Sequence, residues 1–368
     1  MAQAKLTAVP AILTRAYMAA ANVFLRGKPA LGKTVTINAF CDEMKKRIPG
    51  FRSWMFYAPT MSPMDIMASA PDYETGKLKL YCNEALPNAY DDPDVKGVVF
   101  FGELPNADQA TTKLLQKYIN GEDMSGVLRK PKGVVVIADG NRIEDKSSVQ
   151  QQGRAFLSRM AQIEVFSDAD DNMAYAAKQE WHPNIQTFFQ NNPALIDNYD
   201  EVFEIGSARQ KKGGASDLIS EEGRNGIWAN MRSWERINDL EKAAEQLGST
   251  LTLAEIQGSV GSAVAGAYEA HKTTLAKLAS FDEIMRDPVK APIPDVISEQ
   301  YSMCMLVALR CDEKQLGLVR KFAVRMPPEL QIVVLKTLHN RPNFKYRDSK
   351  DYLDWIIDPE VSKLLKAR

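Results

Sequence analysis

A glycine-rich loop near the start of the chain has the residue types and spacing needed to bind phosphate. Its residues match the complete pattern G-x-x-x-x-G-K-[ST]: Gly27, Lys28, Pro29, Ala30, Leu31, Gly32, Lys33 and Thr34. In such a loop the backbone N–H groups converge on phosphate oxygens, the lysine ammonium reaches the outer phosphates, and the threonine hydroxyl binds Mg²⁺. A glycine turn that binds nothing is the alternative. An apolar run before the loop and a helical pattern after it favour a nucleotide site.

A second candidate lies after the apolar run 98–101, where Gly102 and Glu103 follow. Nucleotide hydrolases commonly place an aspartate and then a glutamate at the end of such a strand. The aspartate holds Mg²⁺ and the glutamate orients the attacking water. Because Gly102 replaces the aspartate, we expect weakened magnesium positioning, although Asp139 is a nearby acid that could substitute. The pattern predicts ATP binding and leaves hydrolysis open.

Three further polar residues are candidates for a nucleotide site. Asn141 follows the apolar run 134–137, so its amide could contact the outermost phosphate or the attacking water. Its alternative is a turn former, since Gly-Asn is a common turn sequence. Arg159 and Arg232 follow or lie within helical patterns. Each of these two, taken alone, is a surface arginine.

The elements that would position these residues are an alternating α/β half followed by a helical half. Apolar runs at 23–25, 53–57, 97–101 and 133–137 are continuous, as in a parallel sheet covered on both faces. Helical patterns cover 34–48, 108–119, 173–181, 227–246, 253–279 and 296–309. The proline-rich segment 287–294 predicts a linker. We therefore expect domains at 1–170, 171–285 and 286–368.

Composition narrows the function classes. Of 368 residues, 45% are hydrophobic and the net charge is −1, so nothing in the overall charge favours nucleic acid as a partner. The basic segment 208–214 could touch DNA or an acidic protein face, but a solvated loop is the simpler interpretation. The four scattered cysteines predict reduced thiols in the cytoplasm. Charged and polar residues interrupt the apolar start, so we expect no membrane span.

Taken in order, these segments resemble the MoxR-like branch of the AAA+ ATPases, which carries a helix-2 insert. The segments are GKPALGKT, MDIM leading to VVFFGELPNA, ADGNRIED, AFLSRM and NMRSWERINDL. The resemblance implies a P-loop AAA+ core, with a parallel sheet flanked by helices, an α-helical lid and a helical C-terminal extension. It implies ATP and Mg²⁺ as cofactors. Lys33 and Thr34 would belong to Walker A, Glu103 to Walker B, and Asn141 would be sensor 1.

The same resemblance implies that the site is shared between subunits. Arg159 would be the arginine finger that reaches a neighbour's γ-phosphate, and Arg232 would be sensor 2. Such proteins form homo-oligomeric rings, usually hexamers, remodel or assemble a protein client, and often act with a von Willebrand factor A domain partner. Because of Gly102, a hydrolysis-impaired, nucleotide-dependent scaffold is the alternative. A DNA-directed motor ranks third, because it rests on fold analogy and one basic segment.

Overall fold

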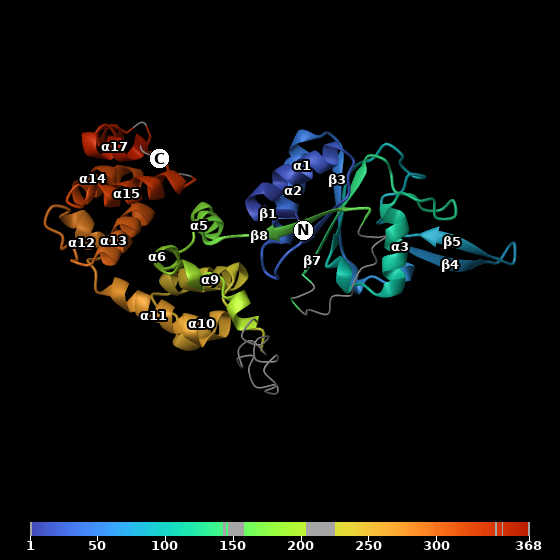
Figure 1. Ribbon diagram of the computed structural model, residues 1–368, viewed down its shortest axis with the longest axis horizontal. Helices are drawn as coiled ribbons and strands as arrows, with labels where there is room; N and C mark the ends of the chain where they lie inside the picture. The colour runs from blue at the N-terminus through green and yellow to red at the C-terminus, as the bar shows by residue number, and fades with distance from the viewer. Residues whose placement is uncertain are drawn as a thin grey trace. The chain divides into compact units, whose positions relative to one another are not determined.

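The chain forms two compact units, Met1–Asp168 and Ala169–Arg368, in the computed structural model (Figure 1). The structure describes residues 2–142, 145, 158–203, 225–342, 344–347 and 349–366. The basic segment 208–214 lies outside the described residues.

The first unit is built on a six-stranded parallel sheet with the order β1-β8-β2-β7-β6-β3. Its strands are β1 (Ala2–Lys5), β2 (Val23–Arg26), β3 (Phe51–Tyr57), β6 (Lys96–Gly102), β7 (Val134–Gly140) and β8 (Ala161–Phe166). The four predicted strands are confirmed as β2, β3, β6 and β7. Strands β1 and β8 were not predicted, because β1 is short and largely exposed and β8 mixes polar with apolar residues. Neither contains the continuous apolar run on which the prediction relied.

Both faces of the sheet are covered, which explains the continuous apolar runs. The covering helices are α1 (Val9–Met18), α2 (Lys33–Arg47) and α3 (Gln109–Ile119). Val98 and Phe100 of β6 belong to the apolar cluster that contains α1 and α2. Val99 and Phe101, the alternate residues of the same strand, belong to the cluster that contains α3. The predicted fold class, an α/β core with a helical C-terminal half, is therefore confirmed.

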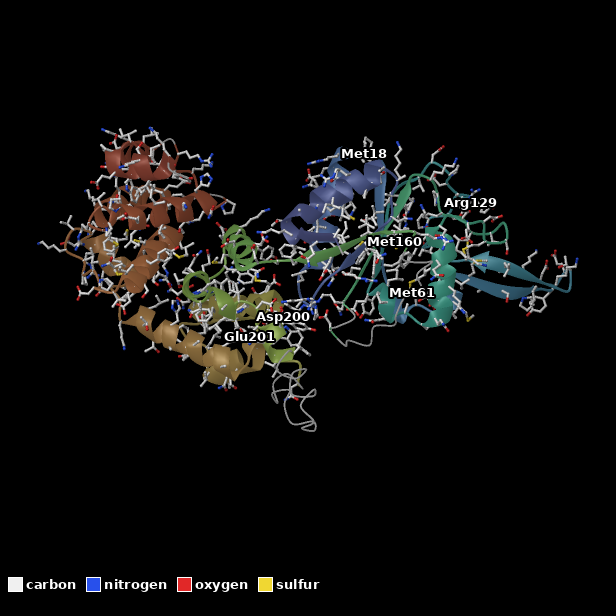
Figure 2. All side chains as sticks on the ribbon, viewed as in Figure 1. Met18, Met61, Arg129, Met160, Asp200 and Glu201 are labelled. Carbon is white, nitrogen blue, oxygen red and sulfur yellow. The ribbon has the colours of Figure 1, made fainter. Side chains whose placement is uncertain are left out.

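A two-stranded antiparallel hairpin is inserted between β3 and β6. It consists of β4 (Met67–Asp72) and β5 (Lys77–Cys82), and its tip residue Tyr73 is 92% exposed. The hairpin was not predicted, because neither of its strands contains an apolar run. Met61, just before the insertion, and Met160 are buried in the sheet's core, where side chains crowd around the strands (Figure 2).

The second unit is helical, and the described residues after Phe166 contain no strand. Its helices are α5 (Ala169–Lys178), α6 (Pro183–Asn191), α9 (Met231–Gln246), α10 (Leu253–Val260), α11 (Ser262–Ala276), α12 (Phe281–Arg286), α13 (Ile297–Arg310), α14 (Leu316–Ala323), α15 (Pro328–Asn340), α16 (Lys350–Ile356) and α17 (Pro359–Lys366). The single helix predicted over 253–279 is wrong. Two helices occupy it, separated by Gly261 at a φ of 86° that favours glycine.

The helices of the second unit enclose two apolar clusters. One cluster surrounds Trp234 and draws on described residues between Ala169 and Tyr268. The other surrounds Trp355 and draws on described residues between Leu278 and Leu364. This arrangement agrees with a lid followed by an extension, a division that remains a prediction. The proline-rich segment 287–294 contains no helix or strand, although Ala291 packs into the second cluster. In the described ranges, no helix has the length and apolar character needed to cross a membrane.

Candidate nucleotide-binding site

The glycine-rich loop connects the end of β2 to the start of α2. Strand β2 lies inside the sheet, between β8 and β7, so the loop opens at the carboxyl edge of the strands. Gly27 approaches a neighbouring strand closely, because a Cβ there would lie 2.7 Å from the carbonyl oxygen of Val165. Ala30 and Gly32 have φ values of 59° and 92°. The loop therefore turns directly into a helix N-terminus, where backbone N–H groups and the helix dipole favour phosphate.

Lys33 lies inside this loop and is only 7% exposed. Its ammonium donates hydrogen bonds of 2.9 Å to the carbonyl oxygens of Gly27 and Lys28, and one of 3.5 Å to Oδ1 of Asn141. Burial lowers the pKa of Lys33, and nearby carboxylates led by Asp139 oppose that shift. The positive charge of Lys33 therefore lies where a loop of this pattern would hold a polyphosphate.

Glu103 follows β6 in the left-handed conformation, with φ of 51°. Its Oε2 accepts hydrogen bonds from the Tyr57 hydroxyl at 3.1 Å and from the Asn106 amide at 2.9 Å. Its own backbone N–H donates to Oδ1 of Asp139 at 2.8 Å. The buried Oδ1 of Asn106 has no hydrogen-bond partner among the described residues. Two hydrogen bonds therefore hold the carboxylate, and a third holds the backbone of Glu103, at the edge of the sheet.

Tyr57 and Asn106 were not predicted as residues of this site. The signal for Tyr57 was available, since it ends β3 at the same edge of the parallel sheet as Glu103. Desolvation, together with the contact with Glu103, raises the pKa of the Tyr57 hydroxyl. Asn106 is three residues after Glu103 and reaches back to it, a local contact that spacing alone does not predict.

The structure places Lys33, Glu103, Asn141 and Asp139 close to one another. Thr34 occupies the first turn of α2, beside Lys33. Hydroxyl and carboxylate oxygens form the donor set that Mg²⁺ prefers, and the loop amides with Lys33 suit a polyphosphate. These residues therefore fit ATP and Mg²⁺. When bound, the ion would neutralise phosphate charge, with Thr34 and a carboxylate available to hold it.

Arg159 does not join these residues. It is exposed and precedes the first residue of β8, and Ala161 of β8 pairs with Val23 at the start of β2. Because the strands are parallel, Arg159 lies at the opposite edge of the sheet from the glycine-rich loop. The four residues of β2 alone span about 13 Å.

Arg232 is the second residue of α9 in the second unit and has an exposed side chain. It belongs to a different compact unit from the glycine-rich loop. Its assignment as sensor 2 therefore remains a prediction.

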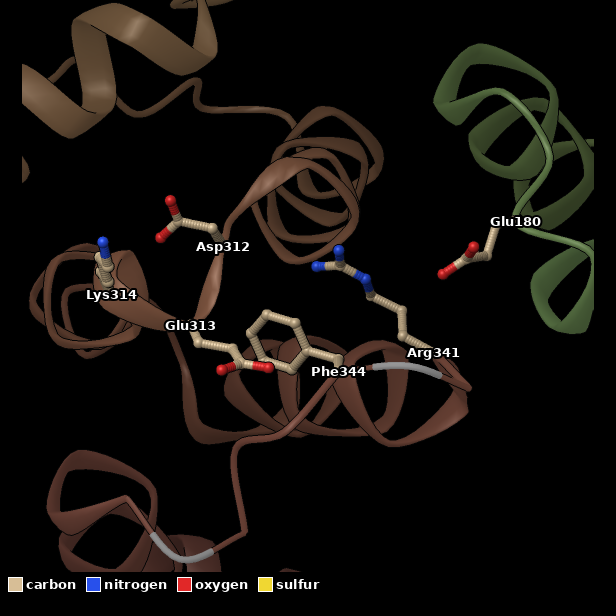
Figure 3. Close-up of a pocket in the computed structure, with 6 residues that line it drawn as sticks. All are labelled: Glu180, Asp312, Glu313, Lys314, Arg341 and Phe344. Carbon is tan, nitrogen blue, oxygen red and sulfur yellow. The ribbon is translucent and has the colours of Figure 1, made fainter.

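The second unit contains a pocket of about 350 Å³ (Figure 3). It is lined by Glu180, Asp312, Glu313, Lys314, Arg341 and Phe344. Arg341 donates to the carbonyl oxygens of Ala308 and Cys311 at 2.9 and 2.7 Å, and its guanidinium stacks on Phe344 at 4.4 Å. These bonds satisfy the carboxyl end of α13. Arg341, one of the two cations that line the pocket, thus has a structural role.

Comparison with known proteins gives only distant likenesses. No protein-family model matches the sequence, and no curated protein matches it. Among solved structures, a candidate ATPase from Cytophaga hutchinsonii shares 11% identity, with 90% of this chain and 81% of that chain covered and a TM-score of 0.29. A mutant RuvB from Thermotoga maritima shares 13% identity over 76% of this chain and 73% of that chain, with a TM-score of 0.35. A second RuvB mutant from the same organism shares 13% identity over 76% of this chain and 71% of that chain, with a TM-score of 0.33.

Proposed function

We propose that this protein binds ATP with Mg²⁺ in the glycine-rich loop and belongs among the AAA+ ATPases. The observation that carries the proposal is the buried ammonium of Lys33, enclosed by a complete P-loop. Asn141 touches the same ammonium and Glu103 acts on it electrostatically, so the residues expected beside the outermost phosphate converge there. A merely structural glycine turn has no need of such a convergence.

Hydrolysis is part of the proposal, with Glu103 orienting the attacking water and Asn141 near the γ-phosphate. The carboxylate is positioned by Tyr57 and Asn106, which favours a defined role for it. A nucleotide-dependent scaffold that does not hydrolyse ATP is the second candidate, favoured by Gly102. Steady-state phosphate release, measured with and without Mg²⁺, separates these two functions.

The proposal extends to a ring of identical subunits, by resemblance a hexamer that acts in the cytoplasm. The position of Arg159 supports this extension, because Arg159 lies at the opposite edge of the sheet from the glycine-rich loop of its own subunit. A neighbouring subunit's site is where its charge would act, and sensor 2 at Arg232 would report the nucleotide state. By the same resemblance, the client is a protein, and a von Willebrand factor A domain protein is the expected partner.

Replacing Lys33 tests the proposal directly. We expect Lys33→Ala to weaken ATP binding at least tenfold, about 1.4 kcal/mol or more, because a charge-assisted contact to phosphate is lost. Calorimetric titration with Mg²⁺ and ATP measures the effect. Lys45→Ala is the matched control, since Lys45 lies in the last turn of the same helix and its ammonium pairs with Asp42. Equal affinities of Lys33→Ala and wild type would contradict ATP binding at this loop.

A further inference from the structure

The acid that is missing from position 102 has a neighbour on the next strand. Strands β6 and β7 run parallel in register, with Phe101 opposite Ala138. One residue further along, Gly102 comes level with Asp139. The 2.8 Å hydrogen bond from the Glu103 N–H to Oδ1 of Asp139 confirms that the two strand ends remain side by side. In a parallel pair, registered residues project from the same face, so Asp139 offers a carboxylate where Gly102 offers none.

Asp139 is unusually enclosed for a carboxylate. It is 3% exposed, and on its other side β7 pairs with β2, where Asp139 lies opposite Leu25. Among the described residues, its Oδ1 accepts the Glu103 N–H and its Oδ2 accepts no hydrogen bond. Burying a carboxylate with one neutral donor is costly unless a cation compensates it. Lys33 acts on it electrostatically, but no ion pair between their side chains is formed in this part of the chain.

We propose that Asp139 supplies the magnesium-binding carboxylate that position 102 lacks, so that the acid has moved one strand closer to the glycine-rich loop. The inference rests on the proposed binding of ATP with Mg²⁺. Strand β7 is the direct neighbour of β2, and the Gly27 N–H donates to the carbonyl oxygen of Gly140 at 3.3 Å. The carboxylate therefore lies between the loop and Glu103. Under this assignment Gly102 is no defect.

The rival explanation is that Asp139 only holds the backbone of Glu103 in its left-handed conformation. Asn can accept the same N–H but is a far poorer ligand for a hard dication, so Asp139→Asn separates the two. The measured quantity is the magnesium gain, defined as ATP affinity with Mg²⁺ divided by affinity with chelator, from calorimetry. We expect Asp139→Asn to reduce the gain at least tenfold and to leave affinity in chelator within about twofold of wild type. The double variant Gly102→Asp/Asp139→Asn should regain most of the gain.

Asp72→Asn is the control, because Asp72 is also buried but lies in the hairpin, paired with Lys79. It should leave the magnesium gain unchanged. An unchanged gain in a folded Asp139→Asn protein overturns the inference, and so does a wild type that binds ATP with no magnesium gain. A wild type that does not bind ATP in either condition instead refutes the proposed function.

The single variant Gly102→Asp provides a test that leaves Asp139 intact, in case Asp139→Asn does not fold. A Cβ at Gly102 would lie 3.2 Å from the Phe100 ring, so the ring must shift by a few tenths of an ångström. If Asp139 already holds the ion, the added acid should raise the magnesium gain less than twofold. A rise of tenfold or more would mean that the position was truly vacant and would overturn the inference.

Discussion

The two units bury polar side chains in different ways. In the first unit, Lys33 and Asp139 are buried at the carboxyl edge of the strands, where their partners come from separate loops. In the second unit, two buried or half-buried pairs join side chains of different helices, Thr187 with His271 and Tyr268 with Glu241. His271 lies 2.9 Å from the Thr187 hydroxyl. Polar groups satisfied inside a core stabilise it, whereas those gathered at an open strand edge are placed for a ligand.

The surroundings of these groups strengthen the contrast. Tyr268 donates a 2.8 Å hydrogen bond to Glu241 while its ring packs edge-on against Phe188 and Trp234, at 5.2 and 5.4 Å between ring centroids. Phe188, Trp234 and Tyr268 are fully buried. They therefore form a core and do not present an exposed stacking platform for nucleic-acid bases.

The largest expected effect tests whether a second subunit contributes Arg159 to the nucleotide site of the first unit. If Arg159 is the arginine finger of a shared site, mixing Arg159→Ala subunits with Lys33→Ala subunits should regenerate some sites that have one intact loop and one intact finger. Neither variant alone can do so. Because a finger contributes on the order of 10³ in rate, the mixture should release phosphate well above either variant.

The control for this experiment is each variant measured alone at the same total protein concentration. If wild-type turnover is too low to measure, ATP-dependent assembly in sedimentation is the readout. A strictly monomeric protein at micromolar concentration with saturating ATP and Mg²⁺ would contradict the shared site.

Local features of this chain could be predicted from its sequence, whereas contacts between distant segments could not. The buried strands β2, β6 and β7 were predictable because each is a continuous apolar run, and the glycine-rich loop because its spacing is specific. The end of one predicted helix at Gly261 was not, since an isolated glycine is tolerated in many helices. The contacts of Tyr57 and Asp139 depend on strand order. Strand order is set by the packing of distant segments, which a single sequence does not display.

A smaller effect tests the internal pairing of the second unit. Burial lowers the pKa of His271 from 6.5 to about 4, so the folded state keeps this ring neutral. The unfolded chain binds a proton below pH 6.5, and the stabilisation present above that pH is lost as the pH falls toward 4. After discounting for the partial exposure of the ring, we expect a loss of order 2 kcal/mol.

Urea unfolding at pH 7 and pH 4.5 measures this loss. Other groups titrate over the same range, so the informative quantity is the difference between wild type and His271→Gln, whose amide keeps a hydrogen-bonding group near Thr187 without titrating. The stability of His271→Gln should fall less on acidification. Parallel losses in the two proteins would show that the Thr187–His271 pair does not respond to pH as a buried pair should.

The smallest expected effect compares one glycine from each unit. Gly266 is exposed in α11 and has no atom within 4 Å of the Cβ that alanine would add, so Gly266→Ala should stabilise the protein by about 1 kcal/mol through helix propensity. At Gly140 the added Cβ would lie 2.6 Å from Cδ of Pro105, next to the turn that carries Asn141. Gly140→Ala should therefore destabilise the protein, by about 1 kcal/mol or more, and weaken ATP binding. Thermal unfolding and calorimetry measure both variants. If the two substitutions changed stability in the same direction, the tight strand edge of the first unit and the tolerant helix of the second would not differ as the structure indicates.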